Sequence, residues 1–97
     1  MNMYNPPHPG DFIKAVYLDP LEVSPRSVAL RLQVSPSTFS RLLKGKSAVS
    51  TEMALRLAKC LGRSPESWLT MQDNYNLWHA KKELDLSGIE PLVAISA

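Results

Sequence analysis

Apolar residues recur at helical spacing in five segments of the chain, and most of these segments carry local start signals for a helix. A Ser-Pro pair precedes three of them, at Ser24-Pro25, Ser35-Pro36 and Ser64-Pro65. Serine caps a helix by accepting a free backbone N–H of the first turn, and proline fits the first helical position because no N–H is needed there. The pattern predicts an all-α fold with five helices.

The first helix is expected to open at Pro9-Gly10-Asp11, with Phe12, Ile13 and Val16 on its inner face. We expect it to end at Asp19-Pro20, because the residue before a proline is disfavoured in the helical region.

Two short helices joined by a three-residue turn come next, which is a helix-turn-helix pattern. The first begins after Ser24, and Val28, Ala29 and Leu32 form its inner face. Ala29 is small, so the second helix can cross it closely without overpacking. The turn itself is 33–35.

The second helix of this pair begins after Ser35 and ends at Gly45, a residue suited to the left-handed conformation. Phe39 and Leu42 are apolar and face the core. The outward residues are small hydroxyls in front and cations behind, namely Ser37, Thr38, Arg41 and Lys44. Such a helix suits the major groove of DNA, so we assign base-edge contacts to Ser37, Thr38 and Arg41.

Charge supports this interpretation once the chain is divided. The net charge is only +2. Residues 24–51, however, contain five basic residues and no acidic one, whereas the flanking segments 1–23 and 52–97 are each slightly acidic. This asymmetry favours polyanion binding, with a merely solvated basic face as the alternative. The residues assigned to phosphate are Arg26, Arg31, Ser35, Lys44 and Lys46.

The fourth helix is expected after Ser50, with Met53, Leu55, Leu57, Ala58 and Leu61 as its apolar surface, and it should end at Gly62. Cys60 lies in it and is expected to be a small buried side chain. A single cysteine excludes an intramolecular disulfide and a cysteine-built metal site.

The fifth helix is expected to run from Pro65 to about Leu86 and is apolar on more than one side. One face can cover the other helices. We assign the second, with Met71, Tyr75 and Trp78, to a homodimer interface. The alternative is that the tail folds back over it. A dimer would hold its two copies of the helix that follows Ser35, the helix assigned to base contacts, about 34 Å apart. The DNA partner should therefore be an inverted repeat.

Length and composition indicate one domain: an irregular arm 1–8, a DNA-binding domain 9–86 and a tail 87–97. No apolar run approaches the length needed to cross a bilayer, and the N-terminus lacks a signal-peptide pattern, so a cytoplasmic protein is expected. No cofactor and no enzyme activity are predicted, because the sequence has no nucleophile elbow and no glycine-rich phosphate loop. His79 and Glu83 alone do not make a metal site.

Several motifs identify a family resemblance. Residues 32–35 and 37–46 resemble a lambda-repressor-like (Xre) helix-turn-helix, and the stretches Asn-Pro-Pro-His-Pro-Gly-Asp at 5–11 and Ser-Pro-Glu-Ser-Trp-Leu at 64–69 resemble the HigA antitoxins. The motifs at 53–58 and 75–78 also resemble the HigA antitoxins. The resemblance implies a dimeric DNA-binding antitoxin that neutralises a HigB-like mRNA-cleaving ribonuclease and represses its own operon.

Two positions depart from the family pattern. Gln33 and Glu22 stand where glycine is common, at the turn and before the second helix. A left-handed Gln33 would cost roughly 1 kcal/mol.

A ribonuclease that grips RNA should be basic, so toxin contact is assigned to the acidic first segment, around Asp11, Asp19 and Glu22, away from the DNA face. Two alternatives to an antitoxin stay open. One is a solitary repressor without a toxin. The other is a protein-interaction module that does not use DNA.

Overall fold

The computed structural model describes residues 5–93, which are helical with no strand among them. The elements are α1 (Pro9–Ile13), the π-helical turn η1 (Lys14–Leu18), α2 (Asp19–Leu21), α3 (Pro25–Leu32), α4 (Pro36–Leu43), α5 (Thr51–Leu61) and α6 (Pro65–Glu83). Because α1, η1 and α2 continue without a break, these are the five predicted helices. The first part of the arm, 1–4, and the end of the tail, 94–97, lie outside the described residues.

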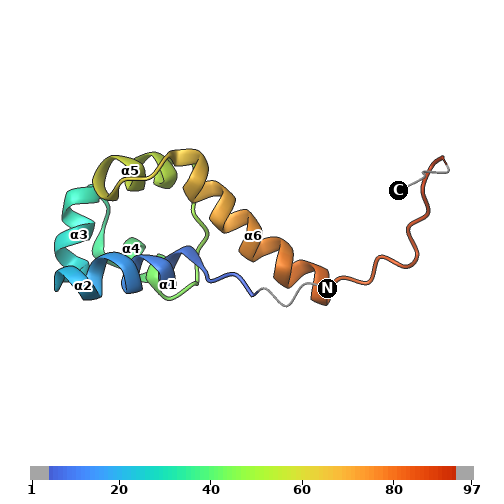
Figure 1. Ribbon diagram of the computed structural model, residues 1–97, viewed down its shortest axis with the longest axis horizontal. Helices are drawn as coiled ribbons and strands as arrows, with labels where there is room; N and C mark the ends of the chain where they lie inside the picture. The colour runs from blue at the N-terminus through green and yellow to red at the C-terminus, as the bar shows by residue number, and fades with distance from the viewer. Residues whose placement is uncertain (1–4, 94–97) are drawn as a thin grey trace.

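Figure 1 shows that the described chain has two parts. Helices α1 to α5 form a bundle, and α6 starts beside the end of α5 and extends away from it. The helix ends at Glu83, not at Leu86 as predicted. Residues 84–93 continue outward and are all exposed, so this part of the tail does not fold back over α6. No helix among residues 5–93 has the length and apolar character needed to cross a membrane.

The first helix differs from its prediction in two ways. It does not end at Asp19-Pro20 but runs on to Leu21, through a turn in which the Asp19 N–H bonds the Lys14 carbonyl. This wider π turn shifts the inner face by one residue. Val16, predicted inside, is therefore 45% exposed, while Leu18 is buried and Tyr17 packs against the core.

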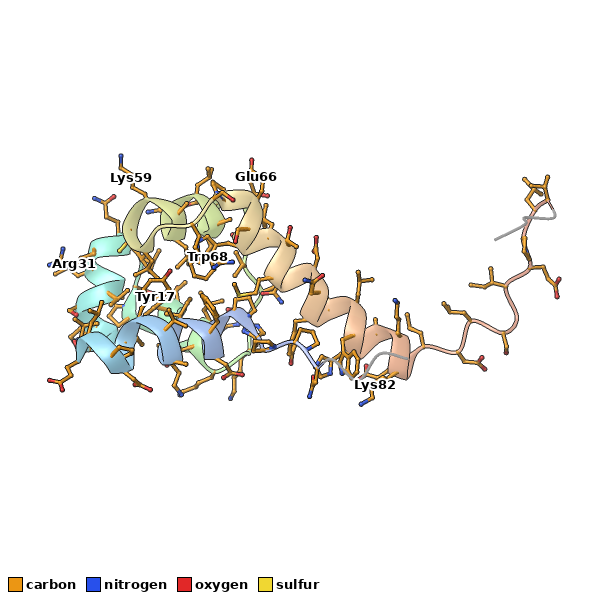
Figure 2. The ribbon with its side chains drawn as sticks, in the orientation of Figure 1. Tyr17, Arg31, Lys59, Glu66, Trp68 and Lys82 are labelled. Atoms are coloured by element: carbon orange, nitrogen blue, oxygen red, sulfur yellow. The ribbon has the colours of Figure 1, made fainter. Side chains whose placement is uncertain are left out.

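Trp68 fastens the long helix to the bundle. It is fully buried, its indole N–H donates to the Gly62 carbonyl at 2.9 Å, and its ring lies 5.9 Å from that of Phe12. Figure 2 shows Trp68 pointing inward toward Tyr17, whose ring centroid is 6.3 Å away. The start of α6 is therefore part of the core, and only its later turns project beyond the bundle.

Helix α5 is confirmed in its bounds but not in its full apolar face. Its buried residues are Ala54 and Leu57, with Ala58 and Leu61 partly buried one turn further on. Leu55, predicted as part of the apolar surface of this helix, is 56% exposed, because it falls outside this i, i+3, i+4, i+7 stripe. Cys60 is half-buried rather than buried.

Candidate nucleic-acid interface

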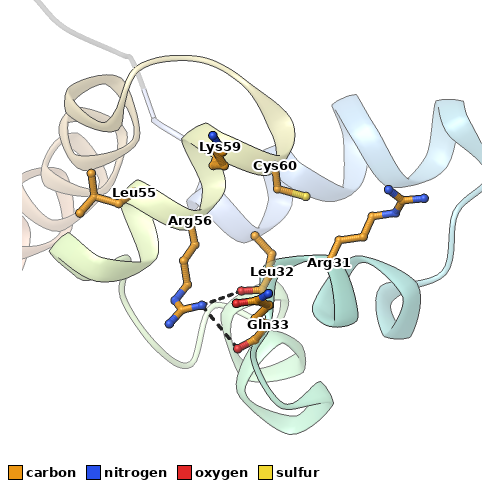
Figure 3. A pocket seen from close by; sticks show the side chains of 7 residues that line it. All are labelled: Arg31, Leu32, Gln33, Leu55, Arg56, Lys59 and Cys60. Carbon is orange, nitrogen blue, oxygen red and sulfur yellow. Dashed lines mark hydrogen bonds between the residues drawn. The ribbon is translucent and has the colours of Figure 1, made fainter.

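The turn between α3 and α4 sets how the second helix is presented. Gln33 is left-handed, with φ of 62°, as its turn position required. The Val34 N–H returns to the Ala29 carbonyl at 3.1 Å. From α5, the Arg56 guanidinium donates to the Leu32 carbonyl at 2.8 Å and approaches that of Gln33 at 3.5 Å (Figure 3). These bonds satisfy carbonyls at the end of α3 and stabilise the strained turn.

The front of α4 is a cluster of three hydroxyl side chains. Ser35 caps the helix, as predicted, by accepting the Thr38 N–H at 3.1 Å. Its oxygen also lies 2.8 Å from the Thr38 hydroxyl and 3.2 Å from that of Ser37. All three residues are exposed. Hydroxyl groups can donate or accept, so the cluster can meet base edges or phosphates of different kinds.

Cations follow the hydroxyl cluster along α4 and its exit loop. Arg41, Lys44 and Lys46 are exposed. Within residues 5–93 the ion pair is Arg56 with Glu52, at 2.7 Å, so none of these three cations has a carboxylate partner in that range. The Lys46 N–H bonds the Arg41 carbonyl at 2.9 Å, which folds the loop back against the helix end. These cations therefore form an exposed basic surface without a direct ion pair among the described residues.

The two arginines of α3 do not lie together. They are five residues apart, which places them about 140° apart around the helix axis. Arg26 is exposed in the first turn of α3. Arg31 lines a groove between α3 and α5 with Lys59 and Cys60, and in Figure 3 it points away from Arg56. The two predicted phosphate contacts of α3 thus lie on different sides of the helix, and Arg31 faces the groove toward α5.

A glycine brings the first helix against α4. A Cβ atom on Gly10 would lie 2.1 Å from the Leu42 carbonyl oxygen and 2.9 Å from the Leu43 Cα atom. Both contacts are with backbone, so no side chain can move aside. Glycine is required here because α1 and α4 touch directly, and this contact fixes α4 from behind.

Helix α6 holds the loop that follows α4. Gln72 is buried, and its side-chain oxygen accepts the N–H of the buried Val49 at 2.8 Å. Its amide nitrogen donates to Asn76 at 3.0 Å. No residue pattern singles out Gln72, because a polar residue in a helix normally faces solvent. It was missed for that reason.

His8 was also missed, because it stands among prolines and does not border a run of apolar residues at helical spacing. It is 4% exposed and caps α1, with its Nδ1 atom accepting the Gly10 N–H at 2.9 Å. Its ring lies edge-on to that of Tyr75, with centroids 4.9 Å apart. Burial lowers the pKa of His8 below 6.5, against smaller raising effects of the Ser47 backbone and the charge of Asp11.

The residues assigned to toxin contact are exposed on the first helix. Glu22 is left-handed, with φ of 55°, at the end of α2. Asp19 shares a groove of about 290 Å³ with Lys14 on its own helix and Lys44 on α4. The prediction that this acidic segment lies away from α4 is therefore wrong at Asp19.

The residues assigned to a dimer interface are spread along α6. Met71 is partly buried against the core. Tyr75 lies between His8 and His79, with ring centroids 4.9 and 4.3 Å away. Trp78 is half-buried with Lys82 5.6 Å above its ring, and its indole N–H has no partner among residues 5–93. The later turns of α6 thus combine aromatic surface with an unsatisfied donor.

Comparison with known proteins agrees with this geometry. A family model described as helix-turn-helix matches residues 13–68. The uncharacterized HTH-type transcriptional regulator YddM of Escherichia coli K12 is 45% identical over 93 residues, which cover 96% of this chain and 98% of that protein. Antitoxin HigA-1 of Vibrio cholerae is 31% identical, over 74% and 68% of the two chains. The solved structure of Pseudomonas aeruginosa antitoxin HigA with the higBA promoter has a TM-score of 0.78, 29% identity and coverage of 91% and 99%.

Proposed function

The chain belongs to the Xre-type helix-turn-helix family that includes the HigA antitoxins, and we propose that it is a dimeric operator-binding antitoxin. Similar proteins are named as transcriptional regulators and antitoxins, not as enzymes. The observation that carries the proposal is the front of α4, where exposed hydroxyls and Arg41 lie on a helix whose neighbouring cations have no acidic partner in the described residues.

Helix α4 enters the major groove with its N-terminal end deepest. Ser37, Thr38 and Arg41 read base edges, and Arg41 is suited to guanine because its guanidinium can donate to O6 and N7 together. Lys44 and Lys46 contact phosphates, which position the protein without selecting a sequence.

Titration of the chain with fluorescent DNA from its own promoter tests the DNA part. We expect tighter binding to the promoter than to scrambled DNA of equal length, with log affinity falling linearly as log salt rises. Equal affinity for both DNAs would leave only nonspecific binding. Absence of binding to either would refute DNA recognition.

Two copies would join through the later turns of α6. A single chain presents one short reading helix, and the exposed Leu77 beside Trp78 is apolar surface that a second copy can cover. Sedimentation at micromolar concentration should give twice the chain mass. Trp78→Ala should shift the protein toward monomer, whereas Leu30→Ala, an exposed leucine on α3, should not. A monomeric wild-type protein contradicts this part.

The toxin partner is a HigB-like basic ribonuclease, and charge attraction to the first helix supports its docking there. Because Asp19 also neighbours Lys44, the test must be made without DNA. Paired reversal of Asp19 and Glu22 to lysine should weaken co-purification with a ribonuclease encoded beside the gene. Glu66→Lys on α6 is the matched control. Equal capture by the wild type, the double variant and Glu66→Lys would mean that the toxin docks away from the first helix.

A further inference from the structure

His8 touches three parts of the molecule that are far apart in sequence. Its Nδ1 atom accepts the Gly10 N–H at the start of α1. Its ring packs edge-on against Tyr75 of α6. On the side of α4, a Cβ atom on Gly45 would lie 3.7 Å from the His8 ring, and the Ser47 backbone is close enough to raise the pKa of that ring.

The hydrogen bond at Nδ1 fixes the protonation state of this ring. A nitrogen that accepts the Gly10 N–H carries no proton, so the neutral ring has its proton on Nε2. That nitrogen is the one able to donate to the Ser47 carbonyl. Protonation of Nδ1 would turn the acceptor into a donor facing the Gly10 N–H, and the cap would be lost.

The segment that His8 supports carries the phosphate-binding cations. Gly45 and Ser47 flank Lys46, and Lys44 precedes them. The same ring packs edge-on against Tyr75 of α6, the helix of the proposed dimer interface. His8 therefore contacts both α6, which carries the proposed dimer interface, and the loop whose cations are proposed to bind DNA.

We infer that His8 is a positioning residue for operator binding: its neutral ring holds residues 44–47 against α6, and loss of that ring or of its neutral form releases Lys46 from the phosphate it contacts. This inference rests on the proposed DNA-binding function. It adds to that function a residue that touches no DNA and a dependence of promoter affinity on pH.

The charged and titratable groups around His8 come from each element packed on it. Asp11 of α1 favours the protonated ring through its charge. Tyr75 and, behind it, His79 lie on α6, and Lys46 stands in the loop. Burial outweighs Asp11 and keeps the pKa of His8 below 6.5, so the ring is neutral at pH 7. Loss of affinity should therefore set in only below pH 6.5.

The decisive variant is H8N, because asparagine is a good helix cap but cannot reach Tyr75 or the loop. It separates capping from positioning. We expect H8N to remain folded at the assay temperature and to bind its promoter about threefold to tenfold more weakly, the scale of coupling between neighbouring sites. The slope of log affinity against log salt should fall by about one phosphate contact.

Two further measurements distinguish positioning from general destabilisation. Lys46→Ala should remove most of the effect of H8N in a double-mutant cycle, because both act on the same phosphate contact. Promoter affinity of the wild type should also fall as the pH drops below about 6.5. H79Q, which changes the other of the two histidines, should retain this fall, and H8N should lose it.

Additive losses in H8N and Lys46→Ala would overturn the inference, as would a wild-type affinity that is constant or rises on acidification. So would a pH dependence that H79Q abolishes and H8N keeps. If H8N does not fold, the pH profiles of the wild type and H79Q decide the question without it. Absence of promoter binding by the wild type at pH 7.5 would instead refute the proposed function itself.

Discussion

Gly10→Ala should push the first helix away from α4, the helix proposed to contact base edges. The added Cβ atom would stand 2.1 Å from the Leu42 carbonyl oxygen, whereas ordinary contact begins at 3.4 Å. The first turn of α1 must therefore withdraw by about 1.3 Å, the difference between these two distances. Overpacking of this kind costs about 1–3 kcal/mol, and the alanine recovers only about 0.5–1 kcal/mol of helix preference.

Thermal unfolding followed by circular dichroism measures this cost. Each kcal/mol should lower the unfolding temperature of a domain of this size by about 4–8 °C. Gly88→Ala is the matched control, because its Cβ atom would meet nothing within 4 Å. If both variants unfold at the wild-type temperature, the direct backbone contact between α1 and α4 is not the support described above.

Three other perturbations test the supports of α4. Gln72→Leu should lower the free energy of unfolding by about 1–3 kcal/mol in a denaturant titration, because the buried Val49 N–H loses its acceptor; an unchanged midpoint would contradict this. Arg56→Met should lower the free energy of unfolding by about 1 kcal/mol, because the Leu32 carbonyl loses its donor. Equal stability of variant and wild type would mean that this hydrogen bond does not stabilise the turn. Stability should also depend on pH through His8: in the unfolded chain it gains a proton near pH 6.5, but burial lowers its pKa in the folded chain, so stability is complete above pH 6.5 and falls as the pH drops through the folded pKa. Denaturant midpoints across this range should decline in the wild type and stay level in H8N.

Local signals predicted the helix starts correctly. The serines before α3, α4 and α6 each accept an N–H three residues on, as at Ser24, Ser35 and Ser64. Capping and proline placement depend only on neighbours in the chain, so sequence alone determines them. At Gln33, where the family pattern commonly has glycine, the structure shows the left-handed conformation that costs roughly 1 kcal/mol.

The supports of the site could not be predicted in this way. Gln72 bonds a residue 23 positions away, and His8 joins a loop and a helix that only the fold brings near. The inner face of the first helix was misjudged because a single π turn rotates every later residue, which exposes Val16. Such a turn leaves no local mark except Pro20, which was taken as the helix end.

Two DNAs compared side by side test whether α4 reads base edges through Arg41. Affinities of wild type and Arg41→Ala are measured for promoter DNA and for random DNA at one salt concentration. For Arg41→Ala we expect a loss of about 1–3 kcal/mol on the promoter, a smaller loss on random DNA, and relaxed preference at one base pair. Equal losses on both DNAs would mean that Arg41 contacts only phosphate, and the reading role of α4 would be contradicted.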